Sequence, residues 1–134
     1  MELEEALTAH LKAQSGLTAL VGHRIYPDEI PQGTKLPCVC YIKISDIKEH
    51  QYIGQDSFER PVYQLTAFAA TKPSARQVTN QLKAALSDYC GDMSGIEVQK
   101  IELQNELSSL VTTADGTTRT YTEYLEYEIN YIRR

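Results

Sequence analysis

The stretch Ile25-Tyr-Pro-Asp-Glu-Ile-Pro-Gln-Gly-Thr-Lys-Leu-Pro-Cys-Val-Cys-Tyr41 decides how the chain is organised. Its first part is interrupted by Pro27, Pro31, Gly33 and Pro37. We expect residues 25–36 to lie outside regular structure, because proline fixes φ and lacks an N–H while glycine frees the backbone. Residues 38–44 follow directly and are rich in β-forming side chains, which predicts a strand. A proline-rich arm therefore leads into the first strand.

Two segments have the apolar spacing of amphipathic helices. The first carries Leu3, Leu7 and Leu11 and ends at Ser15-Gly16, and residues 17–21 add at most one more turn. The second follows a candidate N-cap and a proline in residues 71–74. Its spaced residues are Ala75, Val78, Leu82, Ala85, Leu86 and Tyr89, and Gly91 ends the pattern.

Further strands are predicted over residues 58–70, 96–103 and 120–132. In the last of these, Tyr121, Leu125, Tyr127, Ile129 and Tyr131 share one face, while Thr122, Glu126, Glu128 and Asn130 share the other. Asp115-Gly116 is typical of a tight hairpin turn, towards which the flanking strands can extend as a ribbon. Long polar hairpin tips are predicted at residues 48–57 and 107–118.

The order helix, hairpin, helix, hairpin predicts an α+β fold. Two hairpins can merge into one four-stranded, mainly antiparallel sheet, in α-β-β-α-β-β order, with two helices packed on one face. At 134 residues, the chain is expected to form a single domain over residues 1–134.

Charge and composition restrict the functions to consider. The net charge is −5 with a pI near 5.2, and there is no basic stripe of the kind that grips nucleic acid without regard to sequence. The N-terminus is acidic, and no apolar run approaches the ~18 residues of a membrane span, so a soluble protein is expected. Cys38, Cys40 and Cys90 form no CxxC motif, which favours a reducing compartment.

The sequence offers little for catalysis. His10, His23 and His50 fall in three different elements, and no GxSxG, phosphate loop or HExxH occurs. A pair of Cys38 or Cys40 with a histidine could act as a nucleophile and its base. Cysteines in the middle of a strand are, however, typical of buried and unreactive thiols. We therefore predict no catalytic residue, cofactor or metal site, and expect that the protein is not an enzyme.

Tyrosine is the residue type that stands out. The chain has nine tyrosines, two phenylalanines and no tryptophan, and tyrosine is enriched at protein interfaces. The tyrosines of residues 120–132 are either core residues with solvated hydroxyls or contact residues, and Tyr124, on the polar face, is the better interface candidate. With the two hairpin tips, the predicted interface comprises Lys48, His50, Tyr52, Gln55, Leu110, Val111, Asp115, Arg119 and Tyr124.

Four short motifs carry a family resemblance: Arg24-Ile-Tyr-Pro27, Pro31-Gln-Gly33, Leu36-Pro-Cys-Val-Cys-Tyr41 and Phe68-Ala-Ala-Thr71. In this order, after a helix and before a second helix and two closing strands, they resemble the tail-completion (tail-terminator, head–tail joining) proteins of long-tailed, siphovirus-type bacteriophages and prophages. Cys38 departs from the pattern, which has an aromatic residue after the proline.

The resemblance implies a structural virion protein that forms a ring, expected to be hexameric, on the head-proximal end of the tail tube. Its partners would be further copies of itself, the tail-tube protein and a head-completion or connector protein. DNA would cross the lumen without specific binding, and assembly would take place in the host cytoplasm without a membrane or cofactor. Two alternatives remain: a connector or stopper on the head side, or a small-molecule-binding α+β domain, indicated by a deep pocket lined by Tyr and His.

Overall fold

The computed structural model describes residues 3–28, 36–50, 57–87, 89–93, 95–112 and 119–133. These residues form helices and strands in the order ααβββαβββ. The elements are α1 (Leu3–Lys12), α2 (Ser15–Val21), β1 (Ile25–Pro27), β2 (Cys38–His50), β3 (Ser57–Ala69), α3 (Lys72–Leu86), β4 (Gly91–Met93), β5 (Ile96–Thr112) and β6 (Arg119–Arg133).

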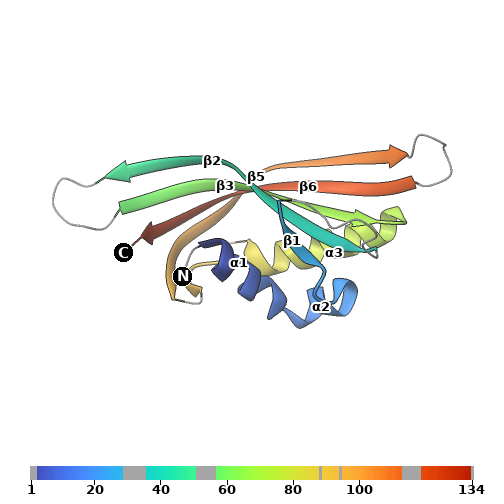
Figure 1. Ribbon diagram of the computed structural model, residues 1–134, viewed down its shortest axis with the longest axis horizontal. Coiled ribbons are helices and arrows are strands. Elements are labelled where there is room, and N and C mark those ends of the chain that lie inside the picture. Colours follow the sequence, from blue (N-terminus) through green and yellow to red (C-terminus); the bar gives the residue numbers. More distant parts are fainter. Residues whose placement is uncertain are drawn as a thin grey trace.

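The strands form one curled, mixed sheet in the order β1-β2-β3-β6-β5-β4. β1 runs parallel to β2, and the other neighbours are antiparallel. All three helices lie against the same side of the sheet, beneath its middle (Figure 1). The predicted four-stranded, mainly antiparallel sheet with two helices is therefore wrong: the described residues form six strands, one pairing of which is parallel, and three helices.

The third helix arises because the N-terminal helical segment is broken. Gln14 has extended backbone angles (φ −84°, ψ 107°), so α2 starts as a separate helix and ends at Gly22. α2 lies close to α3: a Cβ added to Gly16 would come within 2.2 Å of Oε1 of Gln81. Leu17 and Val21 of α2 are buried, which confirms that this segment joins the core.

The two additional strands are short edge strands. β1 takes the first three residues of the predicted irregular arm and lies beside β2, where Val39 N donates to Arg24 O (2.9 Å) and Asp28 N donates to Tyr41 O (2.7 Å). Pro27 is tolerated here because an edge strand does not need its N–H. β4 pairs antiparallel with the first three residues of β5.

The second predicted helix is confirmed as α3. The Thr71 side chain accepts a hydrogen bond from Ser74 N (3.3 Å), which caps the helix, and Pro73 lies in its first turn. α1 is joined to the C-terminal end of α3 through His10, whose Nε2 lies 2.9 Å from Ala85 O and whose ring lies 4.5 Å from that of Tyr89. Within the described residues, no helix is long and apolar enough to cross a membrane.

The core lies between the helices and the sheet. Its buried side chains include Leu7, Leu11, Val78, Leu82, Leu65, Tyr63, Leu125, Tyr127 and Ile129. In the last strand, Leu125, Tyr127, Ile129 and Tyr131 are buried as predicted, but Thr122 and Asn130 of the opposite face are buried as well, and Tyr121 is half-buried. Burial raises the pKa of the Tyr127 hydroxyl, even though this hydroxyl lies 3.1 Å from the Ser87 hydroxyl.

The long strands β2 and β5 carry extra residues where the pairing register shifts, one in β2 and two in β5. Shifts occur between Lys43 and Ser45 in β2, and between Val98 and Lys100 and between Leu103 and Asn105 in β5. Such bulges bend a strand and increase its twist. They help to explain how the sheet curls. The ends of the β2–β3 and β5–β6 hairpins point to opposite ends of the molecule because β3 and β6, which start at these ends, pair antiparallel (Figure 1).

Candidate assembly interface

The two hairpins place the predicted tip residues at opposite ends of the long axis (Figure 1). Lys48 and His50 lie at the C-terminal end of β2, opposite Glu59 and Ser57 of β3 respectively. At the other end of the molecule, Val111 lies in β5 opposite Thr120, and Arg119 begins β6 opposite Thr112. The remaining predicted tip residues, Tyr52, Gln55 and Asp115, lie outside the described residues.

Two predicted contact residues lie on opposite faces of the β5–β6 hairpin. Leu110 pairs with Tyr121 on the face towards α3 and is 47% exposed, as the predicted ribbon requires. Tyr124 pairs with Leu107 on the outer face, away from the helices, and is half-buried. One flat partner surface therefore cannot cover both residues.

The outer face of the sheet carries a row of side chains across four strands. Register joins Cys40, Thr66, Tyr124 and Leu107 in this row. Leu107 is 49% exposed, and Ile42, the next outward residue of β2 after Cys40, is 39% exposed. This face is lined with half-exposed apolar groups, and none of the helices covers it (Figure 1).

The cysteines are placed as the strand pattern predicted. Cys38 and Cys40 share the outer face with Phe68 and Thr66, their partners in β3; Cys38 is buried and Cys40 half-buried. Burial raises the pKa of the Cys38 thiol to about 11, and burial together with the charge of Asp28 raises that of Cys40. Thiols with raised pKa values are mostly protonated at neutral pH and are poor nucleophiles.

Both long edge strands are only partly covered. β1 pairs with residues 39–41 of β2, and β4 pairs with residues 96–98 of β5. Within the described residues, positions 42–50 of β2 and 99–112 of β5 have no strand on their outer side. An open edge presents unpaired N–H and C=O groups to which a strand from another chain can add.

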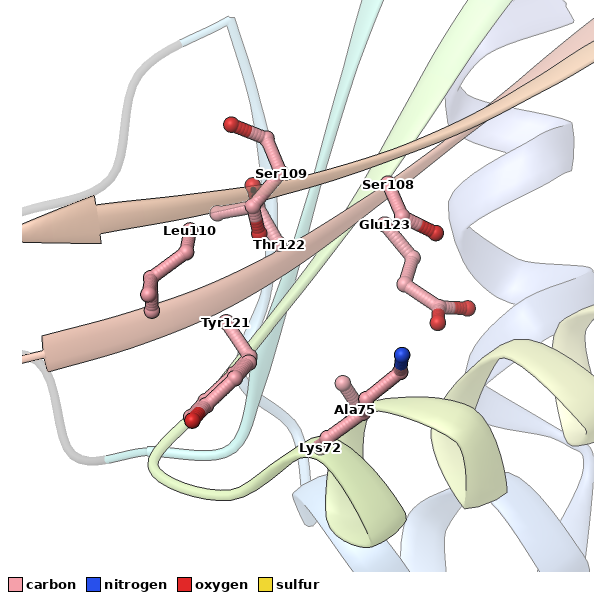
Figure 2. A pocket seen from close by; sticks show the side chains of 8 residues that line it. All are labelled: Lys72, Ala75, Ser108, Ser109, Leu110, Tyr121, Thr122 and Glu123. Carbon is pink, nitrogen blue, oxygen red and sulfur yellow. Dashed lines mark hydrogen bonds between the residues drawn. The ribbon is translucent and has the colours of Figure 1, made fainter.

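A cavity lies where the β5–β6 hairpin passes over the start of α3 (Figure 2). Its volume is about 250 Å³, and its lining comprises Lys72, Ala75, Ser108, Ser109, Leu110, Tyr121, Thr122 and Glu123. Of these, only Leu110 was predicted as a site residue. The sequence did hold a signal for Glu123, because strand alternation places it on the same face as Leu125 and Tyr127, where an acid is out of place.

A wider groove runs between α1 and β1. Its volume is about 670 Å³, and His23, Tyr26 and Tyr41 are among the residues that line it. The Tyr41 hydroxyl already forms hydrogen bonds with the Thr8 hydroxyl and with Glu4 O (3.4 Å). This hydroxyl therefore serves to hold α1 on the sheet.

Comparison with known proteins defines the class. A family model matches residues 5–129, nearly the whole chain, and that family consists of structural proteins of bacteriophage tails. This chain is accordingly a structural tail protein, and it belongs to the family described as Tail completion protein gp17.

One solved structure shows the same fold. A chain of the "virion of native gene transfer agent (GTA) particle" superposes with a TM-score of 0.65 at 18% sequence identity, over 96% of this chain and 94% of that one. A second solved structure has a TM-score of 0.48 at 16% identity, with 94% of each chain covered. No curated protein sequence matches this chain.

Proposed function

We propose that the protein caps the head-proximal end of a tail tube as a ring, stops tube polymerisation and presents the surface to which the head is joined. The family match over residues 5–129 carries this proposal. In this role the protein binds other proteins and catalyses no reaction. Its partners are further copies of itself, the tail-tube protein on one side and a head-completion protein on the other.

The shape of the subunit supports ring formation. A closed ring needs a heterologous contact, in which one surface of each subunit meets a different surface of the next. The two hairpin ends lie at opposite ends of the subunit (Figure 1), and each belongs to an edge strand that is uncovered over most of its length. Neighbouring copies can therefore meet end to end, with strand addition at these edges as the source of backbone hydrogen bonds.

The charge of the subunit suits a lumen that DNA must cross. A net charge of −5 disfavours tight, sequence-independent contacts with phosphates. We expect weak or no binding of purified double-stranded DNA at 0.15 M salt. A tight, salt-sensitive complex would contradict this part of the proposal.

The decisive experiment is electron microscopy of tail tubes that lack their terminator, incubated with the purified protein. We expect a ring at one end of each tube and no further increase in tube length. If the tubes remain bare while DNA-filled heads acquire a knob, the protein is a connector or stopper on the head side.

The β5–β6 tip can be tested separately. Deleting residues 111–117 shortens the hairpin beyond the core, so the variant should fold while losing tail joining. The matched control deletes residues 51–56 in the opposite tip, which reports whether the two ends have different partners. Normal yields of infectious particles from the 111–117 deletion would refute the role assigned to this loop.

A further inference from the structure

The short strand β1 closes one end of the β2 edge. Backbone groups of Arg24 and Asp28 bond to β2. Ile25 and Pro27 occupy the alternate positions, so their backbone groups point away from the sheet. Ile25 N already donates to His23 O (2.9 Å), and Pro27 has no N–H. β1 therefore offers no backbone donor to a further strand.

The short strand β4 closes one end of the β5 edge. The C=O of Asp92, its middle residue, accepts a hydrogen bond from the Tyr89 hydroxyl (2.7 Å). Among the described residues, the regular edges that have no strand on their outer side are residues 45–50 of β2 and 106–112 of β5. Folded proteins blunt the edges that must not pair, so these two open edges are candidate contact sites.

Alternation along the strands assigns the backbone groups that each open edge presents. In an antiparallel pair, every second residue exchanges both its hydrogen bonds with its partner, and the residues between them face the other way. Val39 N donates to Arg24 O beside β1, so the next residue, Cys40, faces β3. The alternation continues along β3 and β6, whose own residues carry no register shift. The residues that present their N–H and C=O groups outwards are Asp46, Lys48 and His50 of β2, and Ser108, Leu110 and Thr112 of β5.

A hydrogen bond outside the ladder supports this assignment. Glu106 belongs to the same outward-facing series of β5, and its N–H donates to Asn105 Oδ1 (2.9 Å) instead of to β6. The Glu106 N–H is therefore already used, and a further strand finds the next N–H of the series at Ser108.

We propose that the open β5 edge of one copy pairs with the open β2 edge of the next copy, as antiparallel strands. The inference rests on the proposed ring and specifies the contact between its subunits. The register opposes the outward-facing residues of the two edges in three pairs: His50 with Ser108, Lys48 with Leu110, and Asp46 with Thr112. Each pair exchanges two hydrogen bonds, so the outward-facing groups of both edges are used together.

The directions of the strands fit this contact. β2 and β5 run in opposite directions within the subunit, because every pairing between them in the sheet is antiparallel. A neighbour in the same orientation therefore presents an antiparallel edge. Lys48 lies level with Val98 of its own β5, through Glu59 and Tyr131. Opposing Lys48 to Leu110 displaces the neighbour along the strands, which brings the two subunits end to end.

The β5 edge also carries apolar side chains that a further strand would cover. Leu107, on the outer face, is 49% exposed, and Leu110, on the face towards α3, is 47% exposed. An added strand lies beside both faces of the edge, so it covers part of each side chain. Shifting the register by two residues would oppose His50 to Glu106, whose N–H is already bound, and would leave Thr112 outside the pairing.

Proline substitutions test the assigned edge, because proline removes a single N–H. Leu110→Pro removes an outward-facing N–H, so this variant should keep a melting temperature close to that of wild type. Ser109→Pro, the matched control, removes an N–H that faces β6 and should lower the melting temperature. A larger loss for Leu110→Pro than for Ser109→Pro would overturn the assignment of the edge.

Complementation between two blocked variants tests the partner. Leu110→Pro blocks the β5 edge and Lys48→Pro blocks the β2 edge, so each variant alone should self-associate at least tenfold more weakly than wild type in sedimentation equilibrium. An equimolar mixture should form a dimer through the intact β2 edge of the first variant and the intact β5 edge of the second. Self-association of Lys48→Pro as strong as that of wild type would overturn the proposal in favour of two β5 edges paired about a twofold axis. Absence of the mixed dimer up to the solubility limit would overturn pairing between copies.

Amide hydrogen exchange in the mixed dimer tests the register. The Lys48→Pro subunit contributes its β5 edge, and exchange should slow at least tenfold at Ser108 and Thr112 relative to the same variant alone. The Ser109 amide faces β6 in both states, so its exchange should change little and serves as the internal control. Slower exchange at Glu106 without slower exchange at Thr112 would overturn this register.

Tube capping separates this inference from the function on which it rests. If wild-type protein caps tubes and Leu110→Pro caps them equally well, the paired edges have no role in the ring and the proposed function stands. If wild-type protein does not cap tubes, the proposed function fails, and the mixture of the two variants still decides whether the edges pair.

Discussion

Raising the pH from 7 to 10 should destabilise the protein through Cys38. Its side chain is fully buried, and burial raises the pKa of the thiol from 9.0 to about 11. Between these two values the unfolded chain loses the thiol proton and the folded chain keeps it, so unfolding becomes easier as the pH rises. The stabilisation is complete below pH 9 and is lost as the pH rises through 11.

The size of the effect follows from the shift. Two pKa units correspond to roughly 2.7 kcal/mol in full, and about half of this, on the order of 1.4 kcal/mol, is lost by pH 10. Tyr41 and Tyr127 also have pKa values raised mainly by burial, but their ordinary value is 10.0, so most of their contribution comes at higher pH. The window from pH 8 to pH 10 therefore reports mainly on thiols.

The assay is urea unfolding under reducing conditions at pH 7, 8, 9 and 10. Cys38→Ala removes the thiol at a packing cost that does not depend on pH, so its stability should fall by about 1.4 kcal/mol less than that of wild type. Cys90→Ala, at an exposed cysteine, should follow wild type. The burial argument is wrong if Cys38→Ala and wild type lose stability in parallel over this range.

Three further changes test the fold. Thr71→Ala should cost about 1 kcal/mol in urea unfolding by removing the cap of α3, and Thr71→Ser should restore most of it. Leu125→Ala in the core should lower the free energy of unfolding by roughly 2–5 kcal/mol. Leu107→Ala on the outer face should leave it within about 0.5 kcal/mol of the wild-type value. An equal loss at both positions would contradict the different burial of the two side chains. Gly16→Ala should leave the melting temperature unchanged or raise it, because its Cβ meets only the end of the flexible Gln81 side chain and alanine favours a helix over glycine. A lower melting temperature that Gln81→Ala restores would contradict this expectation.

Helices and strands with a strong local sequence pattern could be predicted from the sequence alone. α3 has a cap, a proline at its start and apolar residues every three or four positions, and all three features act within the helix itself. β3 and β6 alternate between apolar and more polar side chains, so the residues of their inward face could be assigned before the sheet order was known. The predicted contact residue Tyr124 could be placed on its face in the same way.

The missed elements depend on partners distant in sequence. β1 and β4 have three residues each and exist because β2 and β5 offer them an edge. β5 continues to Thr112 through polar residues with little β preference, because β6 supplies hydrogen bonds along that length. The cavity at Glu123 also needs the start of α3 beside the hairpin, and no spacing within one strand reveals that.

The bulges narrow the part of each open edge that a neighbouring copy can use. A bulge breaks the regular spacing of N–H and C=O groups, so a straight strand cannot pair continuously across it. The register shift of β2 lies between Lys43 and Ser45, and the second shift of β5 lies between Leu103 and Asn105, which leaves residues 45–50 and 106–112 as regular edges without a described strand on their outer side. These segments lie beside the two hairpin tips, at opposite ends of the subunit (Figure 1). In the proposed ring, strand addition between copies is therefore expected at the two ends of the subunit, the arrangement that an end-to-end contact needs and that sideways sheet growth would not produce.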